Sequence, residues 1–107
     1  MTNEEFTHLI DIRCYIDDHL KNNLPVKCIC TKTFEVPHYE NGKFTNYNVV
    51  TKGSIWHIKW RFFHYILENC DTRRCIGMIE EYFFEFFKVL TNEVIINEDF
   101  FDNFEIL

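Results

Sequence analysis

The chain has 107 residues, of which 47% are hydrophobic and 18% aromatic, so it predicts one globular domain rather than a disordered chain. Its formal net charge is −6, which makes nucleic-acid binding an unfavoured function because a negatively charged surface repels phosphates. Its apolar runs are too short to cross a membrane and its first residues lack a secretory signal, so we expect a cytoplasmic protein without membrane contact.

The cysteines and the residue usage bear on the compartment and the origin of the protein. Five cysteines without a secretory signal indicate free thiols in a reducing compartment, and an odd number excludes complete internal pairing. Ala and Gln are absent and Asn occurs ten times, a bias toward residues with AT-rich codons. A short chain of this kind fits an accessory gene of a phage or virus, which would act in the host cytoplasm, and also a low-GC cellular gene.

A helix is predicted over residues 3–22. A capping box opens the segment, its apolar residues recur on one helical stripe, and Leu24-Pro25 ends it. Arg13 and Asp17 interrupt the stripe four residues apart, a spacing at which they are expected to pair with each other.

Residues 26–37 and 43–51 are rich in β-forming residues and predict a hairpin. Asn41-Gly42 between them is a strong turn signal, because both central positions of a type I′ turn need positive φ. Pro37 indicates an edge or a bulge near the end of the first strand.

Residues 54–70, SIWHIKWRFFHYILENC, allow two interpretations. The first half alternates like a strand, but the alternation fails after Phe62. As a helix, the segment collects Trp56 and Trp60 into one apolar stripe, and a narrow polar stripe remains that comprises His57, Arg61, His64 and Glu68. We favour the helix, with both tryptophans in the core and the polar stripe at an interface or solvent edge.

Residues 72–90 predict a second long helix, with Asp71 or Thr72 as its N-cap. Asn97 can cap a short acidic terminal helix that holds Phe100, Phe101 and Phe104, or residues 94–96 can form a short strand. The predicted fold class is α+β in a single domain, residues 1–107: an N-terminal helix, a β-hairpin, two longer helices and a short acidic C-terminal helix.

Metal binding and catalysis are weakly indicated. Four thiolates could complete a tetrahedral zinc site, and the weak candidates for its ligands are Cys28, Cys30, Cys70 and Cys75. The spacings between these cysteines differ from those usual in zinc sites, so we predict no metal and no cofactor. Cys75, with His57 or His64 as its base, is the first suspect for cysteine catalysis. No Gly-rich anion-binding loop accompanies it, so we predict a protein that is not an enzyme.

The C-terminal part of the chain suggests partner binding. Residues 76–107 hold eight acidic residues against Lys88 alone, and exposed phenylalanines on an acidic background are typical of an interface. We therefore expect a non-enzymatic protein that binds a protein partner with a basic surface stoichiometrically, such as a viral inhibitor of a host factor, and that can form a homodimer. The expected contacts are Glu81, Phe84, Glu85, Asp99, Phe101 and Asp102. The alternative is a small zinc-stabilised or nucleic-acid-binding regulator.

Overall fold

The computed structural model describes residues 2–91 and 104–106 and is predominantly β. In chain order the elements are α1 (Asn3–Lys21), β1 (Lys27–Cys30), β2 (Phe34–Glu40), β3 (Lys43–Val50), β4 (Ile55–Arg61), β5 (His64–Asn69), β6 (Cys75–Ile79), α2 (Glu80–Phe86), β7 (Phe87–Thr91) and β8 (Phe104–Ile106). The predicted fold class, with two longer helices after the hairpin, is therefore wrong.

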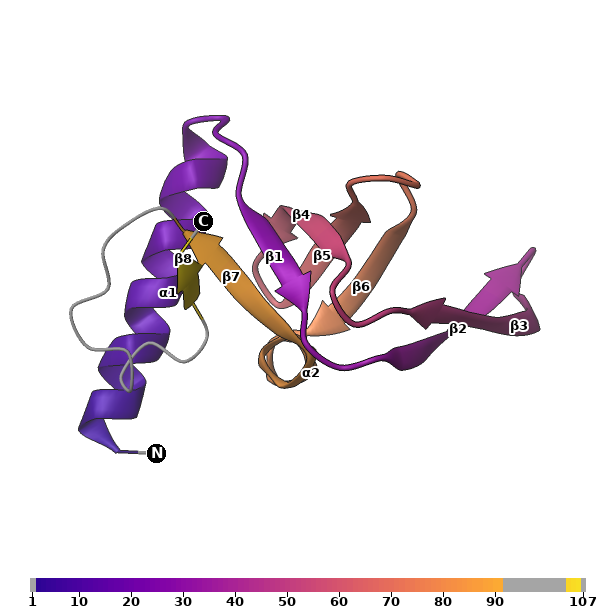
Figure 1. The fold of residues 1–107 in the computed structure, drawn as a ribbon, viewed down its shortest axis with the longest axis horizontal. Coiled ribbons are helices and arrows are strands. Elements are labelled where there is room, and N and C mark those ends of the chain that lie inside the picture. The colour runs from indigo at the N-terminus through magenta and orange to yellow at the C-terminus, as the bar shows by residue number, and fades with distance from the viewer. Residues whose placement is uncertain (1, 92–103, 107) are drawn as a thin grey trace.

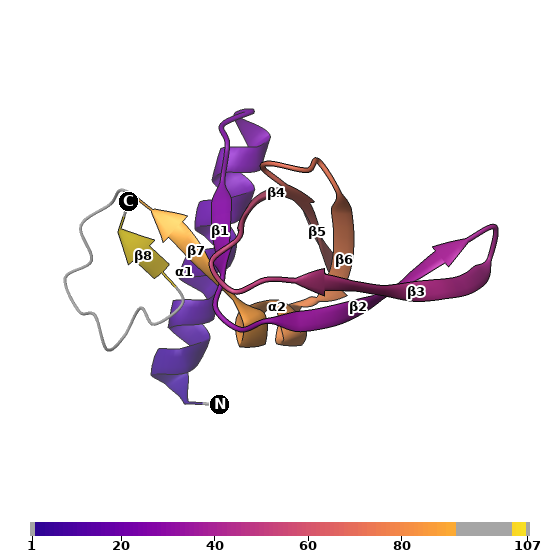
Figure 2. The ribbon, with the colours of Figure 1, turned by 45° about the vertical axis from the view of Figure 1, so that its right-hand side comes forward.

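Six of the strands form one curved sheet in the order β6-β5-β4-β1-β7-β8. All neighbouring strands run antiparallel except β7 and β8, which are parallel. The strands β2 and β3 form a separate hairpin that projects from this body (Figure 1). In a turned view, β4, β5 and β6 curl around the interior and α2 lies at one end of the curved sheet (Figure 2).

The core fills the concave side of the sheet. Ile12 and Ile16 of α1 enter it from one side, and the stacked rings of Tyr65, Phe83 and Phe87 form its centre. The ring centroids of Tyr65 and Phe83 are 4.2 Å apart, a distance typical of favourable aromatic stacking. Burial of these large apolar side chains is the main favourable contribution to folding.

The N-terminal helix is confirmed, and its end is a Schellman motif. Asn23 takes a left-handed conformation with φ of 55°, which Asn tolerates better than most residues. The Leu24 N–H donates to the His19 carbonyl at 2.8 Å, and the Asn23 N–H donates to the Leu20 carbonyl at 3.2 Å. The chain thus leaves the helix sharply and runs into β1.

The hairpin prediction is confirmed at its turn and wrong at its first strand. Asn41 and Gly42 both have positive φ, 51° and 79°, as a type I′ turn requires. Residues 26–37, however, divide between two sheets: β1 enters the six-stranded sheet and only β2 pairs with β3.

The predicted helix over residues 54–70 is wrong, because the segment is the strand pair β4–β5. Two features hide its alternation. A register shift between Ile58 and Trp60 inserts an extra residue, Lys59, and the turn at Phe62-Phe63 carries none of the usual turn residues. The strong β propensity of Ile, Trp, Tyr and Phe prevails over a coincidental helical stripe.

The predicted helix over residues 72–90 is also wrong, since it is divided into β6, the short α2 and β7. Asp71 and Thr72, which were the predicted N-cap residues, instead lie in the turn after β5. There the Asn69 side-chain oxygen accepts hydrogen bonds from the Asp71 and Thr72 N–H groups, an Asx turn. Of the predicted terminal helix, Phe104 lies in the strand β8; Asn97, Phe100 and Phe101, like the alternative strand 94–96, lie outside the described residues.

Candidate functional site

Two arginines and two carboxylates join α1 to the strand β4 and to the start of α2. Arg13 donates to both oxygens of Glu80, and the Tyr65 hydroxyl donates to Glu80 Oε2 at 2.7 Å. Arg61 donates to both oxygens of Asp17, with 2.8 Å between Nε and Oδ1. The predicted pairing of Arg13 with Asp17 is therefore wrong, because each finds its partner outside the helix.

The β4 bulge makes this arrangement possible. Ile58 pairs with Leu67, Trp60 with Ile66 and Arg61 with Tyr65, so the extra residue returns Arg61 to the concave side that Ile58 occupies. Without the bulge, alternation would place Arg61 on the convex face, away from α1.

The pKa of Glu80 shows that this carboxylate is held in its charged form. Burial alone would raise the pKa, but the hydrogen bonds from Arg13 and Tyr65 outweigh it, and the pKa lies below the ordinary value. Burial and the same hydrogen bond to Glu80 raise the pKa of Tyr65, so its hydroxyl stays protonated. Engaged on every side, Glu80 fits a structural role better than proton transfer.

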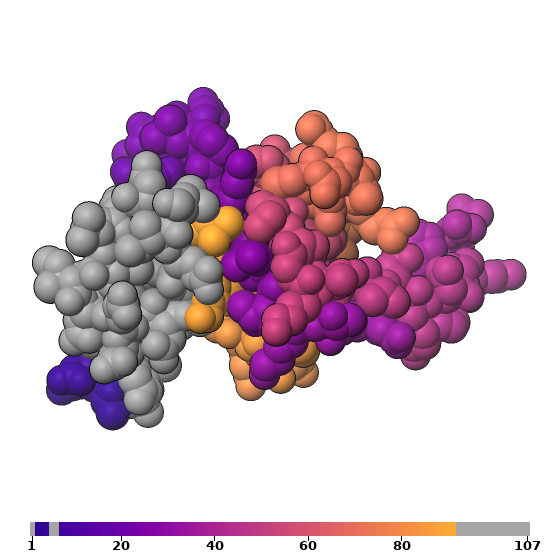
Figure 3. All heavy atoms as spheres, viewed as in Figure 1, coloured from indigo at the N-terminus to yellow at the C-terminus, as the bar shows by residue number. Residues whose placement is uncertain are grey.

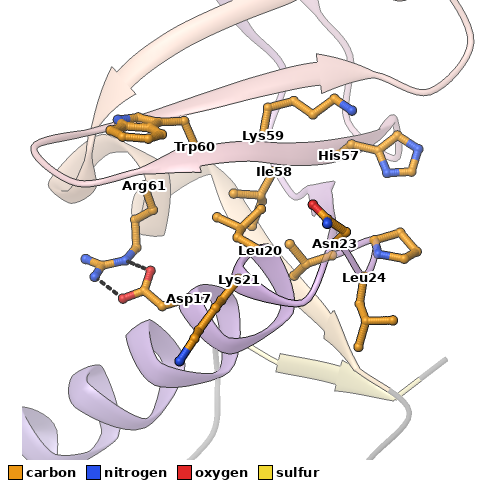
Figure 4. A pocket seen from close by; sticks show the side chains of 12 residues that line it. Asp17, Leu20, Lys21, Asn23, Leu24, His57, Ile58, Lys59, Trp60 and Arg61 are labelled. Carbon is orange, nitrogen blue, oxygen red and sulfur yellow. Dashed lines mark hydrogen bonds and ion pairs between the residues drawn. The ribbon is translucent and has the colours of Figure 1, made fainter.

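A cleft of about 610 Å³ opens beside this ionic cluster, between the end of α1, the following loop and β4. It forms because β1 begins only at Lys27, opposite His57, so the last residues of β4 face the loop instead of a strand. Lys59 and Trp60 extend from β4 on the side away from α1, and Lys21 extends from the helix (Figure 4). We call this site the basic cleft; its polar and aromatic lining residues are Asp17, Lys21, Asn23, His57, Lys59, Trp60 and Arg61.

The charge of the basic cleft is positive although the whole chain is acidic. Its one carboxylate, Asp17, is paired with Arg61, whereas Lys21 and Lys59 make no ion pair with any residue that the structure describes. Burial first, and then the positive charges of Lys27 and Lys59, lower the pKa of His57, which is therefore neutral at pH 7.

The two tryptophans have different environments. Trp56 is 3% exposed in the core, and its indole N–H donates to Ser54 Oγ at 2.8 Å. Trp60 is 56% exposed at the rim of the basic cleft. The prediction that both are core residues is confirmed for Trp56 and wrong for Trp60.

The β2–β3 hairpin presents an apolar face to solvent. Register pairs Pro37 with Tyr47 and Tyr39 with Phe44 on one side, and Val49 continues the same side. Ring centroids are 6.0 Å apart for Tyr39 and Phe44 and 5.1 Å apart for Phe44 and Tyr47. All five side chains are exposed, and the space-filling view shows that the hairpin stands clear of the body (Figure 3). We call these five residues the aromatic hairpin face.

The residues of the predicted polar stripe divide between the two faces of the sheet. His57 and Glu68 are paired on the convex face, where Arg73 binds Glu68 at 3.3 Å. His64 is exposed at the start of β5, whereas Arg61 lies on the concave side in contact with Asp17. The stripe therefore does not exist as one surface.

The predicted partner contacts are brought together only in part. Glu81 and Glu85 are exposed on α2. Phe84 is half-buried and contacts the core rings of Phe83 and Tyr65, with centroids 5.2 and 6.1 Å away. The remaining three, Asp99, Phe101 and Asp102, lie outside the described residues.

The cysteines that were weak zinc candidates face different environments. Cys28 and Cys30 are buried in the core, Cys70 is half-buried and Cys75 is exposed on β6. Burial raises the pKa of Cys28 and of Cys30. Within residues 2–91 and 104–106, no three histidine, cysteine or carboxylate side chains lie close enough to share a metal ion.

The structure also changes the context of Cys75. This residue begins the strand β6 and does not lie in the predicted helix over residues 72–90. Cys75, Glu68 and His57 form one rung across β6, β5 and β4, with the carboxylate in the middle. Neighbouring strands are about 4.8 Å apart, so His57 lies roughly 10 Å from Cys75, beyond hydrogen-bond reach of its thiol.

None of the helices in the described part of the chain is long and apolar enough to span a membrane. Comparison with models of protein families, with curated proteins and with solved structures finds no match to the chain. The two surface features of the described residues that bear on function are the basic cleft and the aromatic hairpin face.

Proposed function

We propose that this protein acts by stoichiometric binding to another protein, which docks on the aromatic hairpin face. The observation that supports it is the exposure of Pro37, Tyr39, Phe44, Tyr47 and Val49 on one side of a projecting hairpin. An isolated two-stranded hairpin is marginally stable in water, and contiguous exposed aromatics of this kind are typical of interfaces.

The distribution of polar groups favours a protein partner over a lipid bilayer. The tip of the hairpin, Glu40-Asn41-Gly42-Lys43, is polar, whereas a hairpin that inserts into lipid would need an apolar tip. The aromatic residues lie along the face instead, and two of them are tyrosines, whose hydroxyls can donate to a partner's polar atoms.

The charge near the face indicates the chemistry of the partner. Glu35 pairs with Val49 on the same side and is exposed, without an ion-pair partner among the described residues. A partner that offers an apolar groove with a basic residue at its rim matches this surface. The bias toward residues with AT-rich codons supports a more specific proposal, in which the partner is a host factor and the protein is its phage- or virus-encoded inhibitor. The acidic residues of the C-terminal part would then attract the basic partner.

The test compares two double variants that make similar changes on different surfaces. Tyr39→Ser/Phe44→Ser alters the aromatic hairpin face, and Phe62→Ser/Phe63→Ser alters two similarly exposed rings at the β4–β5 turn. Affinity capture identifies proteins retained by the wild type, and each is then purified and titrated against all three proteins by calorimetry. We expect a 1:1 complex that the hairpin variant weakens at least about 100-fold, while the turn variant changes affinity less than about threefold.

Three outcomes would overturn the proposal. One is a reconstituted complex that the hairpin variant leaves intact. Another is a wild-type dimer that this variant converts to a monomer, which would assign the face to self-association. The third is binding of the wild type, but not of the hairpin variant, to lipid vesicles.

A further inference from the structure

We propose that the outer edge of β6 pairs antiparallel with β6 of a second copy of this chain, so that the six-stranded sheets of two molecules join into one. The twofold axis of this dimer passes through Gly77, the middle residue of the strand. The edge is a different surface from the aromatic hairpin face, and the inference does not depend on the proposed function.

The outer edge of β6 carries backbone groups that no described strand uses. The strand β6 ends the six-stranded sheet on the side from which the hairpin projects (Figure 1). The Asn69 N–H donates to the Arg74 carbonyl at 2.8 Å, and hydrogen bonding then alternates along the β5–β6 pair. Alternate residues of β6 therefore direct their N–H and carbonyl groups away from β5; these are Cys75, Gly77 and Ile79. No residue of the strand is charged or a proline, the features by which exposed edges avoid pairing.

Antiparallel pairing centred on Gly77 uses all of these outward groups. Gly77 lies opposite Gly77 of the second copy, and Cys75 lies opposite the second copy's Ile79, so about six hydrogen bonds form. On the core side of the sheet, Ile76 lies opposite the second copy's Met78. Every cross-strand pair is therefore small or apolar, and any other register leaves part of the edge without a partner.

The residues that flank β6 make the edge complementary to itself in charge. Arg73 and Arg74 precede the strand and Glu80 and Glu81 follow it, so the charge of the sequence RRCIGMIEE reverses about Gly77. Antiparallel pairing brings the basic end of each strand to the acidic end of the other, whereas parallel pairing would bring like charges together. Arg74 and Glu81 are exposed and make no ion pair with any residue that the structure describes. Both side chains can therefore contact the second copy.

An apolar groove of about 530 Å³ adjoins the same edge, between β6, β2 and α2. Its apolar lining residues include Phe34, Val36, Met78, Ile79, Tyr82 and Phe86. The groove shows that β2 leaves the edge open beside residues 77–79. Because the second copy's Ile76 would lie opposite Met78, its side chain would enter the groove and enlarge the interface beyond the two paired strands.

Sedimentation equilibrium of the full-length protein, under reducing conditions that prevent thiol linkage, measures the oligomeric state. We expect a dimer that Ile79→Pro weakens at least about 30-fold, because one outward N–H is lost from each copy. The φ of Ile79 is −74°, which proline also adopts, so the monomer should keep its fold, and circular dichroism checks this. Ile79→Ala retains the N–H and is the matched control, which should weaken the dimer at most about fivefold.

Charge reversal tests the antiparallel arrangement independently of the proline variant. Arg74→Glu and Glu81→Arg should each weaken the dimer about tenfold, because each brings like charges together at both ends of the interface. An equimolar mixture of these two variants should associate about as tightly as the wild type, since opposite charges then meet at both ends. Recovery on mixing requires a contact between two chains and cannot arise within one.

Several results would overturn this assignment. One is a wild type that stays monomeric at about 100 μM, where a dimer with Kd of about 10 μM is largely formed. Others are equal weakening by Ile79→Pro and Ile79→Ala, no recovery on mixing the charge variants, or a dimer that Tyr39→Ser/Phe44→Ser abolishes. A monomeric wild type whose complex with a purified protein is weakened by Ile79→Pro would assign the edge to a strand of that protein instead.

Discussion

Glu80, the first residue of α2, links α1 to β5 and β4 through its hydrogen bonds and charge. Its carboxylate accepts hydrogen bonds from Arg13 of the helix and from Tyr65 of β5, and Arg61 of β4 lies 3.9 Å away. Removing the negative charge would leave two arginines facing each other with only Asp17 to balance them, so the loss exceeds that of one surface ion pair.

We expect Glu80→Gln to lower the free energy of unfolding by about 2 kcal/mol at pH 7, because charge-assisted hydrogen bonds at a partly buried site are lost. The difference should depend on pH. The pKa of Glu80 in the folded protein lies below the ordinary value of 4.5, so its stabilising effect is complete above pH 4.5 and is lost as pH falls through the folded pKa. Urea unfolding at several pH values measures the gap between wild type and variant, which should narrow in acid.

Glu81→Gln is the matched control, since Glu81 is the exposed neighbour on the same helix. It should change the free energy of unfolding by less than about 0.5 kcal/mol at every pH. A gap for Glu80→Gln that stays constant down to the lowest pH would contradict the assigned role of the carboxylate.

At the scale of elements, the bulge in β4 determines the chemistry of two surfaces. It directs Arg61 to the concave side, where it binds Asp17, and it leaves Lys59 and Trp60 together on the other side. One inserted residue therefore places both the ionic contact with α1 and the lining of the basic cleft.

Deletion of Lys59 tests this role of the bulge. Without Lys59, the residues Ile58, Trp60 and Arg61 alternate as in a regular strand, so Trp60 stays on the convex side and Arg61 stays opposite Asp17. We therefore expect the deletion, like Lys59→Ala, to lower the free energy of unfolding by less than about 1 kcal/mol, measured by urea denaturation. A loss of about 3 kcal/mol or more on deletion would show that Arg61 no longer reaches Asp17 and that Lys59 is not the extra residue.

At the scale of the whole molecule, the β2–β3 hairpin packs on the hydrophobic core only at its base and is exposed farther out. Phe34, at the base of the hairpin, stacks on Phe86 with centroids 4.3 Å apart and meets the edge of Phe87 at 5.9 Å. Beyond this base, the rings of Tyr39 and Phe44 contact each other and are at least half exposed. The stability of the fold should therefore be sensitive to the base of the hairpin and insensitive to its exposed face.

Two phenylalanine substitutions distinguish these regions. Phe34→Ala should lower the free energy of unfolding by about 2 kcal/mol, because it removes a half-buried ring packed on the core. Phe44→Ala should lower it by less than about 1 kcal/mol, since that ring is 50% exposed. Chemical denaturation measures both, and limited proteolysis should cut the hairpin faster in Phe34→Ala alone. Similar losses for the two variants would mean that the hairpin folds as one unit with the body.

The sequence by itself determined the features that depend on neighbouring residues. The helix α1 ends before Pro25, and Asn41-Gly42 forms the turn between β2 and β3, because caps and turns are set by the φ preferences of a few adjacent residues. Cys28 and Cys30 are buried thiols, as short apolar side chains in a β-forming segment usually are.

Only the tertiary structure decided the fold of residues 54–91, the partners of Arg13 and Asp17, and the exposure of Trp60. Alternation over residues 54–70 is interrupted by a bulge and by a turn made of two phenylalanines, so the local pattern imitates a helix. Strand pairing and ion pairing join residues far apart in the chain, such as Arg61 with Asp17, and their free energy appears only when the sheet is assembled. For the same reason the basic cleft could not be predicted from spacing, since its lysines come from a helix and a strand that meet only in the folded protein.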